Sequence, residues 1–492
     1  MTDTTAQTHE DLADDLAELV YLAGSGAHKL AMYDKARGKT DEDTERLSVR
    51  YDALRAELEA MLAQRTTWSS IDIHKLLALK KRAHLALRAL HLLGAAAMSA
   101  AEWQSPSFLH SATSQAGKYT GHVSANINDY QRDHHYDAKA YEHAFRSEYI
   151  THVRTPGVSM TSSGMSAITT VIVGLHNEGK LSGNVVVGKS SYFEYKEVLA
   201  EFCGNRLHEV DEMDVSAVID AITRLKPSAI FIDSLCNVEA IAVPDLSRLI
   251  PAIANTITAP TTLVVDNTGL GPTCQVLAML PRGTDLGLVV VESLQKYHQF
   301  GFDGVTGGII WRDAGTRLNL FRHRMHLGTN IADTSALALP SPNNEMLATR
   351  MARLGRNATY LATTLDAHYR AKPHMLFSHV VYPGLPSHPA YAWSKDMTFH
   401  GSFFTLAFRK FTRFPLLAQA WMRLVIHEAK QAGVDVNGGS SFGFNTTRIY
   451  LTARHATHST VPFIRISAGT ETQVELETLA AVLIRATDRL TV

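Results

Sequence analysis

Several features that mark other classes of protein are scarce in this sequence of 492 residues. Its 3 cysteines provide no disulfide framework, and its net charge of −1 gives no reason to expect nucleic acid or an anionic membrane as a partner. The most apolar helical stretch, around Leu85 to Ala101, is too short to span a bilayer and carries Arg88 and His91. The N-terminus is polar and acidic, unlike a signal peptide. These absences favour a cytoplasmic globular protein.

Residues 1–100 follow the periodicity of helices. Leucines recur at helical spacing from Leu12 onward, and Ser70 is predicted to cap a third helix. The apolar positions expected to face inward in the second helix are Leu47, Tyr51, Leu54, Leu58 and Met61. The basic cluster Lys80-Lys81-Arg82 indicates a solvated helix face more readily than a docking site. We expect these helices to form an appendage or an oligomer-forming arm without chemistry of its own.

From Val158 onward, short β-branched runs alternate with amphipathic stretches, a pattern typical of a mostly parallel sheet with helices on both faces. The predicted strands are Asn184–Gly188, Ala229–Asp233, Thr262–Asp266 and Leu286–Glu292. The predicted helices between them include Val215–Leu225 and Leu246–Ala254. Beyond Asn343 the order changes, and a long helix near Glu345–Ala367 with a strand near Ser402–Phe408 predicts a smaller α+β domain.

Two predicted strands end in groups that can carry chemistry, and ligands of open α/β sheets bind at such ends. Asp266 ends one strand, and Lys296 follows the next. Each alone is a weak signal, since Asp after a strand often caps a turn and Lys there is usually solvated. Together they suit pyridoxal phosphate (PLP): a lysine amine condenses with its aldehyde, and an aspartate keeps its pyridine nitrogen protonated. The small hydroxyl residues and glycine of 161–168, followed by an apolar helix, supply N–H groups for a phosphate.

With these motifs in order, the chain resembles the Cys/Met-metabolism family of PLP enzymes, the group of cystathionine γ-synthase, cystathionine γ-lyase and methionine γ-lyase, over roughly residues 120 to 475. The resemblance implies the aspartate-aminotransferase-like fold (fold type I), with a large α/β domain built on a mostly parallel seven-stranded sheet. We therefore expect a helical extension over 1–115, a PLP-binding large domain over 116–342 and a small α+β domain over 343–492.

The resemblance also assigns roles to individual residues. The implied cofactor-binding residues are Tyr130, Arg132, Ser163, Gly164, Met165, Tyr192, Asn237, Asp266, Ser293 and Lys296. Lys296 would be the Schiff-base lysine, Asp266 the partner of the pyridine nitrogen, and Tyr192 the residue stacked on the ring. These three are the expected catalytic residues.

Further residues are implied to bind the substrate or to join subunits. Arg465 resembles the arginine that binds the substrate carboxylate with two parallel hydrogen bonds. Ser441, in Ser-Phe-Gly, resembles the serine of a Ser-Leu-Gly motif that lies near this arginine in the family. Tyr130 and Arg132 resemble the Tyr-x-Arg that reaches the phosphate of the neighbouring subunit. This implies a homodimer or homotetramer with shared active sites.

Departures from the family pattern concern the surroundings of the substrate. Gln295 replaces the threonine before the lysine, and Asp233 replaces a glutamate. His134 and His135 stand where the family has part of Gly-Asn-Pro-Thr. Adjacent histidines do not readily face one metal ion and no further ligand spacing completes a site, so we expect no metal. Both histidines are instead expected to bind the substrate, because their segment lies beside Tyr130 and Arg132.

The resemblance implies an enzyme that acts on an amino acid with a Cγ leaving group. It would catalyse γ-replacement or γ-elimination through a vinylglycine-type quinonoid. S-adenosylmethionine or a homoserine derivative fits as substrate, with carbon–carbon bond formation in secondary metabolism as one outcome. An aminotransferase, a β-lyase or an aldol-type enzyme is the alternative on the same fold. A non-catalytic protein of this fold is a third interpretation, against which the retention of Lys296, Asp266 and Arg465 argues.

Overall fold

The computed structural model divides into two compact units. It describes residues 3–37, 40, 42–100, 136–151, 155, 157–372, 376–409, 415–452 and 463–490. The first unit comprises Met1–Gly174, Glu292–Trp311 and Leu318–Met346, and the second comprises Leu175–Val291, Arg312–Arg317 and Leu347–Val492. The domain boundaries expected after residues 115 and 342 stay predictions.

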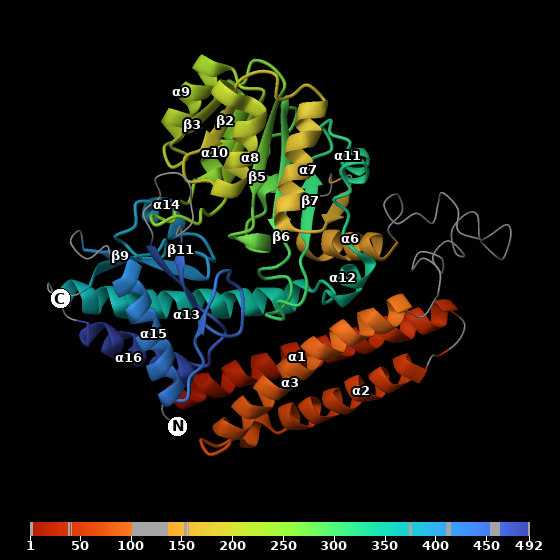
Figure 1. The fold of residues 1–492 in the computed structure, drawn as a ribbon, viewed down its shortest axis with the longest axis vertical. Coiled ribbons are helices and arrows are strands. Elements are labelled where there is room, and N and C mark those ends of the chain that lie inside the picture. Colours follow the sequence, from red (N-terminus) through yellow and green to blue (C-terminus); the bar gives the residue numbers. More distant parts are fainter. Residues whose placement is uncertain are drawn as a thin grey trace. The chain divides into compact units, whose positions relative to one another are not determined.

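The N-terminal part of the first unit is a bundle of three long helices, shown in red and orange in Figure 1. They are α1 (Asp3–Arg37), α2 (Glu42–Ala63) and α3 (Ile73–Ala100), with a 3-10 turn at Arg65–Thr67. Their apolar stripes face each other: Leu12, Leu16, Leu47 and Leu58 are buried, as the periodicity predicts. The predicted helical character of this region is confirmed for the residues that the structure describes, apart from the turn between α2 and α3.

Two local expectations in this bundle are wrong. The third helix begins at Ile73 and not behind Ser70, and the carboxylate of Asp72 accepts hydrogen bonds from the backbone N–H and hydroxyl of Ser69, at 2.9 and 2.8 Å. Lys80 does not lie on a solvated face, because its side chain is buried and pairs with Asp15 at 2.7 Å. A buried charge is tolerated where an opposite charge compensates it.

A polar contact joins α2 and α3, and α1 leaves room for it. The hydroxyl of Tyr51 in α2 lies 3.1 Å from Nδ1 of His91 in α3, and both side chains are buried. On α1, a Cβ at position 26 would lie 2.4 Å from the Tyr51 ring, so Gly26 leaves the room that the ring occupies. Burial, with the charge of Lys29, lowers the pKa of His91 to about 3.

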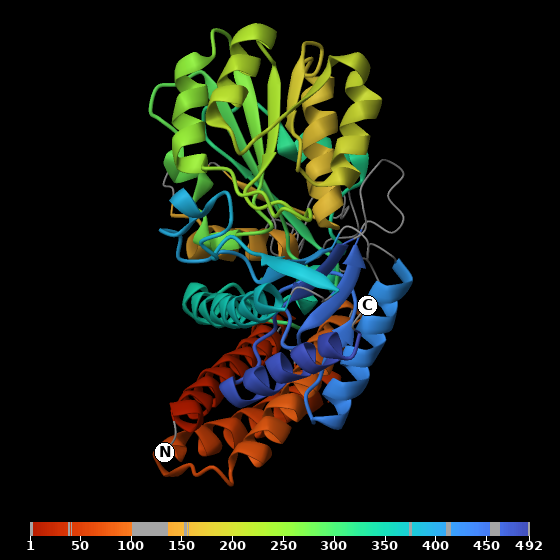
Figure 2. The ribbon, with the colours of Figure 1, turned by 90° about the vertical axis from the view of Figure 1, so that its left-hand side faces the viewer.

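The large sheet has seven strands in the order β1-β7-β6-β5-β4-β2-β3. The strands are β1 (Val158–Thr161), β2 (Val185–Gly188), β3 (Leu207–Val210), β4 (Ala229–Asp233), β5 (Thr261–Asp266), β6 (Leu286–Ser293) and β7 (Gly308–Arg312). β2 to β6 pair in parallel, whereas β1 pairs with β7 antiparallel. Nearly every residue of β4 and β5 is buried, as expected where helices cover both faces (Figure 2). The mostly parallel seven-stranded sheet is confirmed.

The helices of this region follow the alternation that the sequence predicts. They are α6 (Tyr136–Tyr149), α7 (Gly164–Asn177), α8 (Phe193–Cys203), α9 (Val215–Leu225), α10 (Leu246–Thr256), α11 (Leu320–Leu327) and α12 (Asp333–Ala338), with 3-10 turns at Gly204–Arg206, Gly271–Thr273 and Val276–Met279. Asp214 starts α9 by accepting the N–H groups of Ser216 and Ala217. The predicted range Val215–Leu225 matches α9 to the residue.

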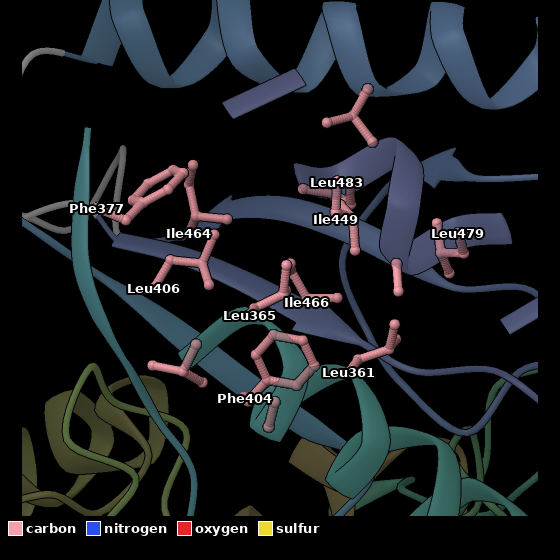
Figure 3. Close-up of a cluster of buried hydrophobic side chains, with 14 of the residues drawn as sticks. Leu361, Leu365, Phe377, Phe404, Leu406, Ile449, Ile464, Ile466, Leu479 and Leu483 are labelled. Atoms are coloured by element: carbon pink, nitrogen blue, oxygen red, sulfur yellow. The ribbon is translucent and has the colours of Figure 1, made fainter. Parts of the chain in front are cut away.

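The C-terminal part of the second unit is a five-stranded sheet packed against helices, in the strand order β10-β11-β12-β9-β8. Its elements are α13 (Asn344–Ala371), β8 (Phe377–Val381), α14 (Tyr391–Ser394), β9 (Phe403–Phe408), α15 (Pro415–Gln431), β10 (Asn437–Gly438), β11 (Arg448–Thr452), β12 (Phe463–Ser467) and α16 (Gln473–Asp488). Figure 3 shows its core, in which Phe377, Phe404 and Ile464 of the sheet lie among leucines of α13 and α16. The smaller α+β domain is confirmed.

Within the residues that the structure describes, no helix is both long and apolar enough to cross a bilayer.

The depressed pKa of His91 predicts an acid-sensitive bundle. As the pH falls below 6.5 the unfolded chain takes up a proton at this histidine, whereas the folded chain does so only near pH 3. The free energy of unfolding therefore decreases between these values, by up to about 1.4 kcal/mol per pH unit. In His91→Gln this component is absent. The free energy of unfolding, measured with denaturant at several pH values from 4 to 7, should therefore change less steeply with pH than in the wild type. His74→Gln, on an exposed side chain, is the control and should keep the wild-type slope. Equal slopes for wild type and His91→Gln would contradict the expectation.

Candidate active site

The start of α7 forms a tightly packed cradle of small polar residues. Ser163 accepts a hydrogen bond from the N–H of Ser166 at 3.0 Å, which starts the helix. A Cβ at Gly164 would lie 2.8 Å from Cβ of Ser293, and a Cβ at Gly308 would lie 2.1 Å from the carbonyl oxygen of Ser163. Only glycine permits these close approaches. The structure thus places Ser163, Gly164 and Ser293 side by side, as the sequence-based prediction requires.

The predicted lysine lies on a segment of turns directly after β6. Lys296 is half-buried, and it follows Ser293, whose hydroxyl lies 3.4 Å from the N–H of Gln295. The side chain of Gln295 reaches within 3.5 Å of the carboxylate of Asp303. Gln295, which replaces the family's threonine beside the lysine, therefore interacts with a later part of the same segment.

In the second unit, two aspartates end neighbouring parallel strands. The register of β4 and β5 sets Asp233 opposite Asp266. Asp233 is buried and accepts the N–H of Tyr192 at 3.0 Å and the hydroxyl of Tyr195. Burial, and then the charge of Asp266, raise the pKa of Asp233 well above its ordinary value. Asp266 accepts the N–H of Thr268 at 2.9 Å.

Tyr192 precedes α8 and lies within the electrostatic influence of two other predicted site residues. Burial, and then the neighbouring Glu194, raise its pKa, so the phenol keeps its proton at neutral pH. Asp266 adds to this rise, and Arg465 opposes it. The structure thus gathers Tyr192, Asp266 and Arg465 within one unit.

The predicted carboxylate-binding arginine is held in a fixed orientation on β12. Arg465 is 3% exposed, and its Nη1 donates to Oδ1 of Asn237 at 2.7 Å, while Nη2 donates to the carbonyl oxygen of Ser441 at 3.2 Å. Ser441 has a φ of 76°, a left-handed conformation that a serine rarely adopts. Backbone strain of this kind concentrates at functional sites. Arg465 therefore contacts Asn237 and Ser441, each of which was predicted from a separate motif.

The sequence-based prediction missed Glu212. Its side chain is fully buried, and it accepts the N–H of Ser190 at 2.9 Å and the thiol of Cys236 at 3.6 Å. It thereby links the turn before Tyr192 to the turn before Asn237. A usable signal existed, because Glu212 follows β3 closely, much as Asp266 ends β5. The aromatic rings of Phe403 and Phe442, near the Arg465 guanidinium, were also not predicted.

Four predicted site residues, Tyr130, Arg132, His134 and His135, lie outside the described residues. Their roles stay predictions. Within the described ranges no group of three histidine, cysteine or acidic side chains is placed to hold a metal ion.

Comparison with solved structures defines the fold class. Cystathionine gamma synthase from Xanthomonas oryzae pv. oryzae, crystallised with cystathionine, aligns with a TM-score of 0.60 at 22% identity over 75% of this chain and 91% of its own. A methionine gamma lyase from Micromonospora echinospora aligns with a TM-score of 0.57 at 22% identity, over 72% of this chain and 87% of its own. The fold is that of fold type I PLP enzymes, as expected.

The family follows from the sequence itself. The family described as "Cys/Met metabolism PLP-dependent enzyme" matches residues 93–479. The chain belongs to this family of enzymes, which confirms the resemblance drawn from the motifs. The cofactor that this membership implies is pyridoxal 5'-phosphate.

Curated relatives match parts of the chain at somewhat higher identity. The "Bifunctional enzyme flvA" of Aspergillus flavus is 26% identical over 344 residues, which are 68% of this chain and 40% of that protein. The methionine gamma-lyase of Arabidopsis thaliana is 29% identical over 255 residues, which are 49% of this chain and 52% of that protein. The chain thus spans about half the length of the curated relatives it matches.

The described residues fit the implied cofactor. The helix start at Gly164, with the hydroxyls of Ser163 and Ser293 beside it, suits a phosphate, because the first N–H groups of a helix lack intrahelical partners. The absence of a Cβ at Gly164 keeps this cradle open. Asp266, at the carboxyl end of β5, has the charge that a pyridinium nitrogen needs as a partner.

The cradle predicts a specific effect of one methyl group. Gly164→Ala should weaken PLP binding by at least about tenfold and lower the free energy of unfolding by about 1–3 kcal/mol, because the new Cβ overlaps Ser293. Absorbance titration of the apoprotein with PLP and denaturant unfolding measure the two effects. Gly157→Ala, with no atom within 4 Å of its Cβ, is the matched control and should leave both unchanged. Wild-type affinity in Gly164→Ala would show that the cradle does not hold the phosphate.

Proposed function

We propose that this chain is a PLP-dependent enzyme that acts on an amino acid with a leaving group on Cγ, by γ-replacement or γ-elimination. The observation that carries the proposal is Arg465, buried on β12 and oriented by Asn237 and Ser441. A guanidinium held at both terminal nitrogens presents a defined plane to a carboxylate. Such a grip is what an enzyme for free amino acids needs.

Each retained residue has a role in holding the cofactor. Lys296 supplies the amine that binds the aldehyde, and Ser163, Gly164, Met165 and Ser293 bind the phosphate. Asp266 pairs with the ring nitrogen, Tyr192 stacks on the ring, and Asn237 bonds the phenolic oxygen. Tyr130 and Arg132 reach the phosphate from a second subunit, in a homodimer or homotetramer.

The protein's own groups then move protons at defined atoms. When bound, the cofactor withdraws electrons from the substrate and so makes its Cα proton acidic. Arg465 would hold the carboxylate while the Lys296 amine removes the Cα proton. For γ-chemistry, Lys296 would first give up that proton and, as a free amine again, take a proton from Cβ, after which the Cγ substituent would leave with the electron pair of its bond. Tyr192 is a neutral phenol at neutral pH and can donate a hydrogen bond, and its raised pKa keeps it protonated at alkaline pH as well.

The finer assignment concerns the leaving group. We propose a homoserine derivative or the sulfonium of S-adenosylmethionine, with carbon–carbon bond formation in secondary metabolism as one outcome. The departures at Gln295, His134 and His135 support a specialised substrate, and the histidines would face it. The relatives named as gamma-synthase and gamma-lyase support chemistry at Cγ. A cytoplasmic location stays a prediction.

A β-lyase is the second candidate, and one observation favours it. A protein from Coxiella burnetii named cystathionine beta-lyase is 28% identical over 236 residues, 48% of this chain and 56% of its own length. In a β-lyase, Lys296 would remove only the Cα proton before the Cβ substituent leaves.

Lys296→Ala tests the cofactor assignment. The purified wild-type protein should be yellow, and the variant should lose the visible absorbance band and about 10²- to 10⁴-fold in rate, because the amine serves as both anchor and base. Lys189→Ala, an exposed lysine of the Tyr192 motif, is the control and should keep the band. A colourless wild-type protein that ignores added PLP would refute the proposal.

Product analysis separates the reactions. Homoserine derivatives should yield 2-oxobutyrate and ammonia by elimination, or a coupled amino acid when a nucleophile is added. S-adenosylmethionine should release methylthioadenosine. Pyruvate from a β-substituted substrate would instead establish the β-lyase, and accumulation of pyridoxamine phosphate would establish an aminotransferase.

A further inference from the structure

The segment that carries Lys296 has an unusual backbone. After β6 the chain runs through turns from Leu294 to Val305. Phe300 and Asp303 have φ angles of 49° and 46°, and Gly301 between them has 80°. Residues with side chains rarely adopt this left-handed conformation, and they keep it only where the surroundings enforce it.

Part of that enforcement comes from inside the segment. The buried amide of Gln299 donates to the carbonyls of Leu294 and Val305, at 3.2 and 2.7 Å, and accepts the N–H of Gly304 at 2.9 Å. These bonds tie both ends of the segment to its middle. A buried pair of Glu292 and His298, at 2.7 Å, closes the stretch that contains Lys296.

The other part comes from helix α3. Arg88 donates from Nε to the carbonyl of Phe302 at 2.6 Å and from Nη2 to the carbonyl of Asp303 at 3.2 Å. His84 lies 3.3 Å from the carbonyl of Phe300. Carbonyls in an irregular buried segment need donors from elsewhere, and α3 supplies them where the left-handed residues lie.

The rings of the segment extend the contact to the rest of the bundle. Phe300 and Phe302 are both buried. Phe302 lies 5.0 Å from the ring of His84 and 5.1 Å from that of His91, and Phe300 lies 6.0 Å from the ring of Tyr21 in α1. Since His91 also contacts Tyr51 of α2, all three helices support the two phenylalanines directly or through one residue.

The bundle also has a second, separate attachment within the same unit. Lys29 donates to the carbonyls of Leu337 and Leu339, and Tyr21 donates to the carbonyl of Ser341 at 2.6 Å. This attachment holds α1, against which α3 packs, to residues outside the segment that α3 supports.

We propose that α3 is a positioning element for the cofactor-binding lysine, in which Arg88 holds the turn of residues 300–303 and thereby sets the place of Lys296. Arg88 is a positioning residue, since it acts through backbone carbonyls and not on the substrate. The N-terminal helices are then part of the catalytic apparatus, in addition to any role in assembly. The inference rests on the proposed function of Lys296.

Arg88→Ala in the full-length protein tests the inference. Hydrogen exchange of peptides covering 294–305 should accelerate, while peptides of α1 and α2 exchange as in the wild type. PLP affinity, from absorbance titration of the apoprotein, should fall about tenfold, and kcat should fall about 10- to 100-fold with KM little changed, because a small displacement of a reacting group has effects of this size. Arg88→Lys, which keeps a donor, should restore part of each effect.

Arg82→Ala is the matched control, because Arg82 lies on the same helix, is exposed and pairs with Glu57. It should leave exchange, affinity and kcat unchanged. If Arg88→Ala keeps the wild-type PLP affinity and kcat, the proposal is overturned even if hydrogen exchange of the segment accelerates. It is also overturned if hydrogen exchange accelerates uniformly across α1 to α3 and Arg88→Lys does not reduce this acceleration. A wild-type protein that binds no PLP would refute the proposed function instead, and the exchange measurement would still report whether Arg88 holds the segment.

Discussion

Buried charge has to be compensated by hydrogen bonds or by opposite charge, and this constraint shapes the surroundings of Tyr192, Asn237 and Arg465. Asp233 is bound by the backbone of Tyr192, Glu212 by that of Ser190, and Arg465 by Asn237. Each of these bonds connects a strand, or the turn after it, to a turn that carries a proposed cofactor or substrate ligand. The cost of burying the charge is offset only in one arrangement of the turns, so the compensation also orients the site.

The same principle connects the N-terminal helices to the lysine segment. Carbonyl groups of left-handed residues cannot join a regular ladder, and Arg88 provides several N–H groups in one rigid plane. The expectation from their sequence, an appendage or an oligomer-forming arm without chemistry of its own, stays a prediction, and these contacts support the positioning role proposed above.

Most of the architecture was predictable because it depends on local periodicity. Strands such as Ala229–Asp233 and helices such as Val215–Leu225 were predicted to the residue, since buried parallel strands are continuous apolar runs and amphipathic helices repeat every three to four residues. Errors arose where a polar residue interacts with a distant partner. Lys80 was expected in solvent, but Asp15 of another helix compensates its charge.

The sequence by itself determined the family, the cofactor and the class of fold, because these depend on residue types in a fixed order along the chain. Tertiary structure alone decided which residues meet: Gly164 against Ser293, Asn237 against Arg465, and Arg88 against the turn beyond Lys296. The physical reason is that such contacts join residues far apart in the chain. Their distances follow from the packing of helices and strands, which no local pattern encodes.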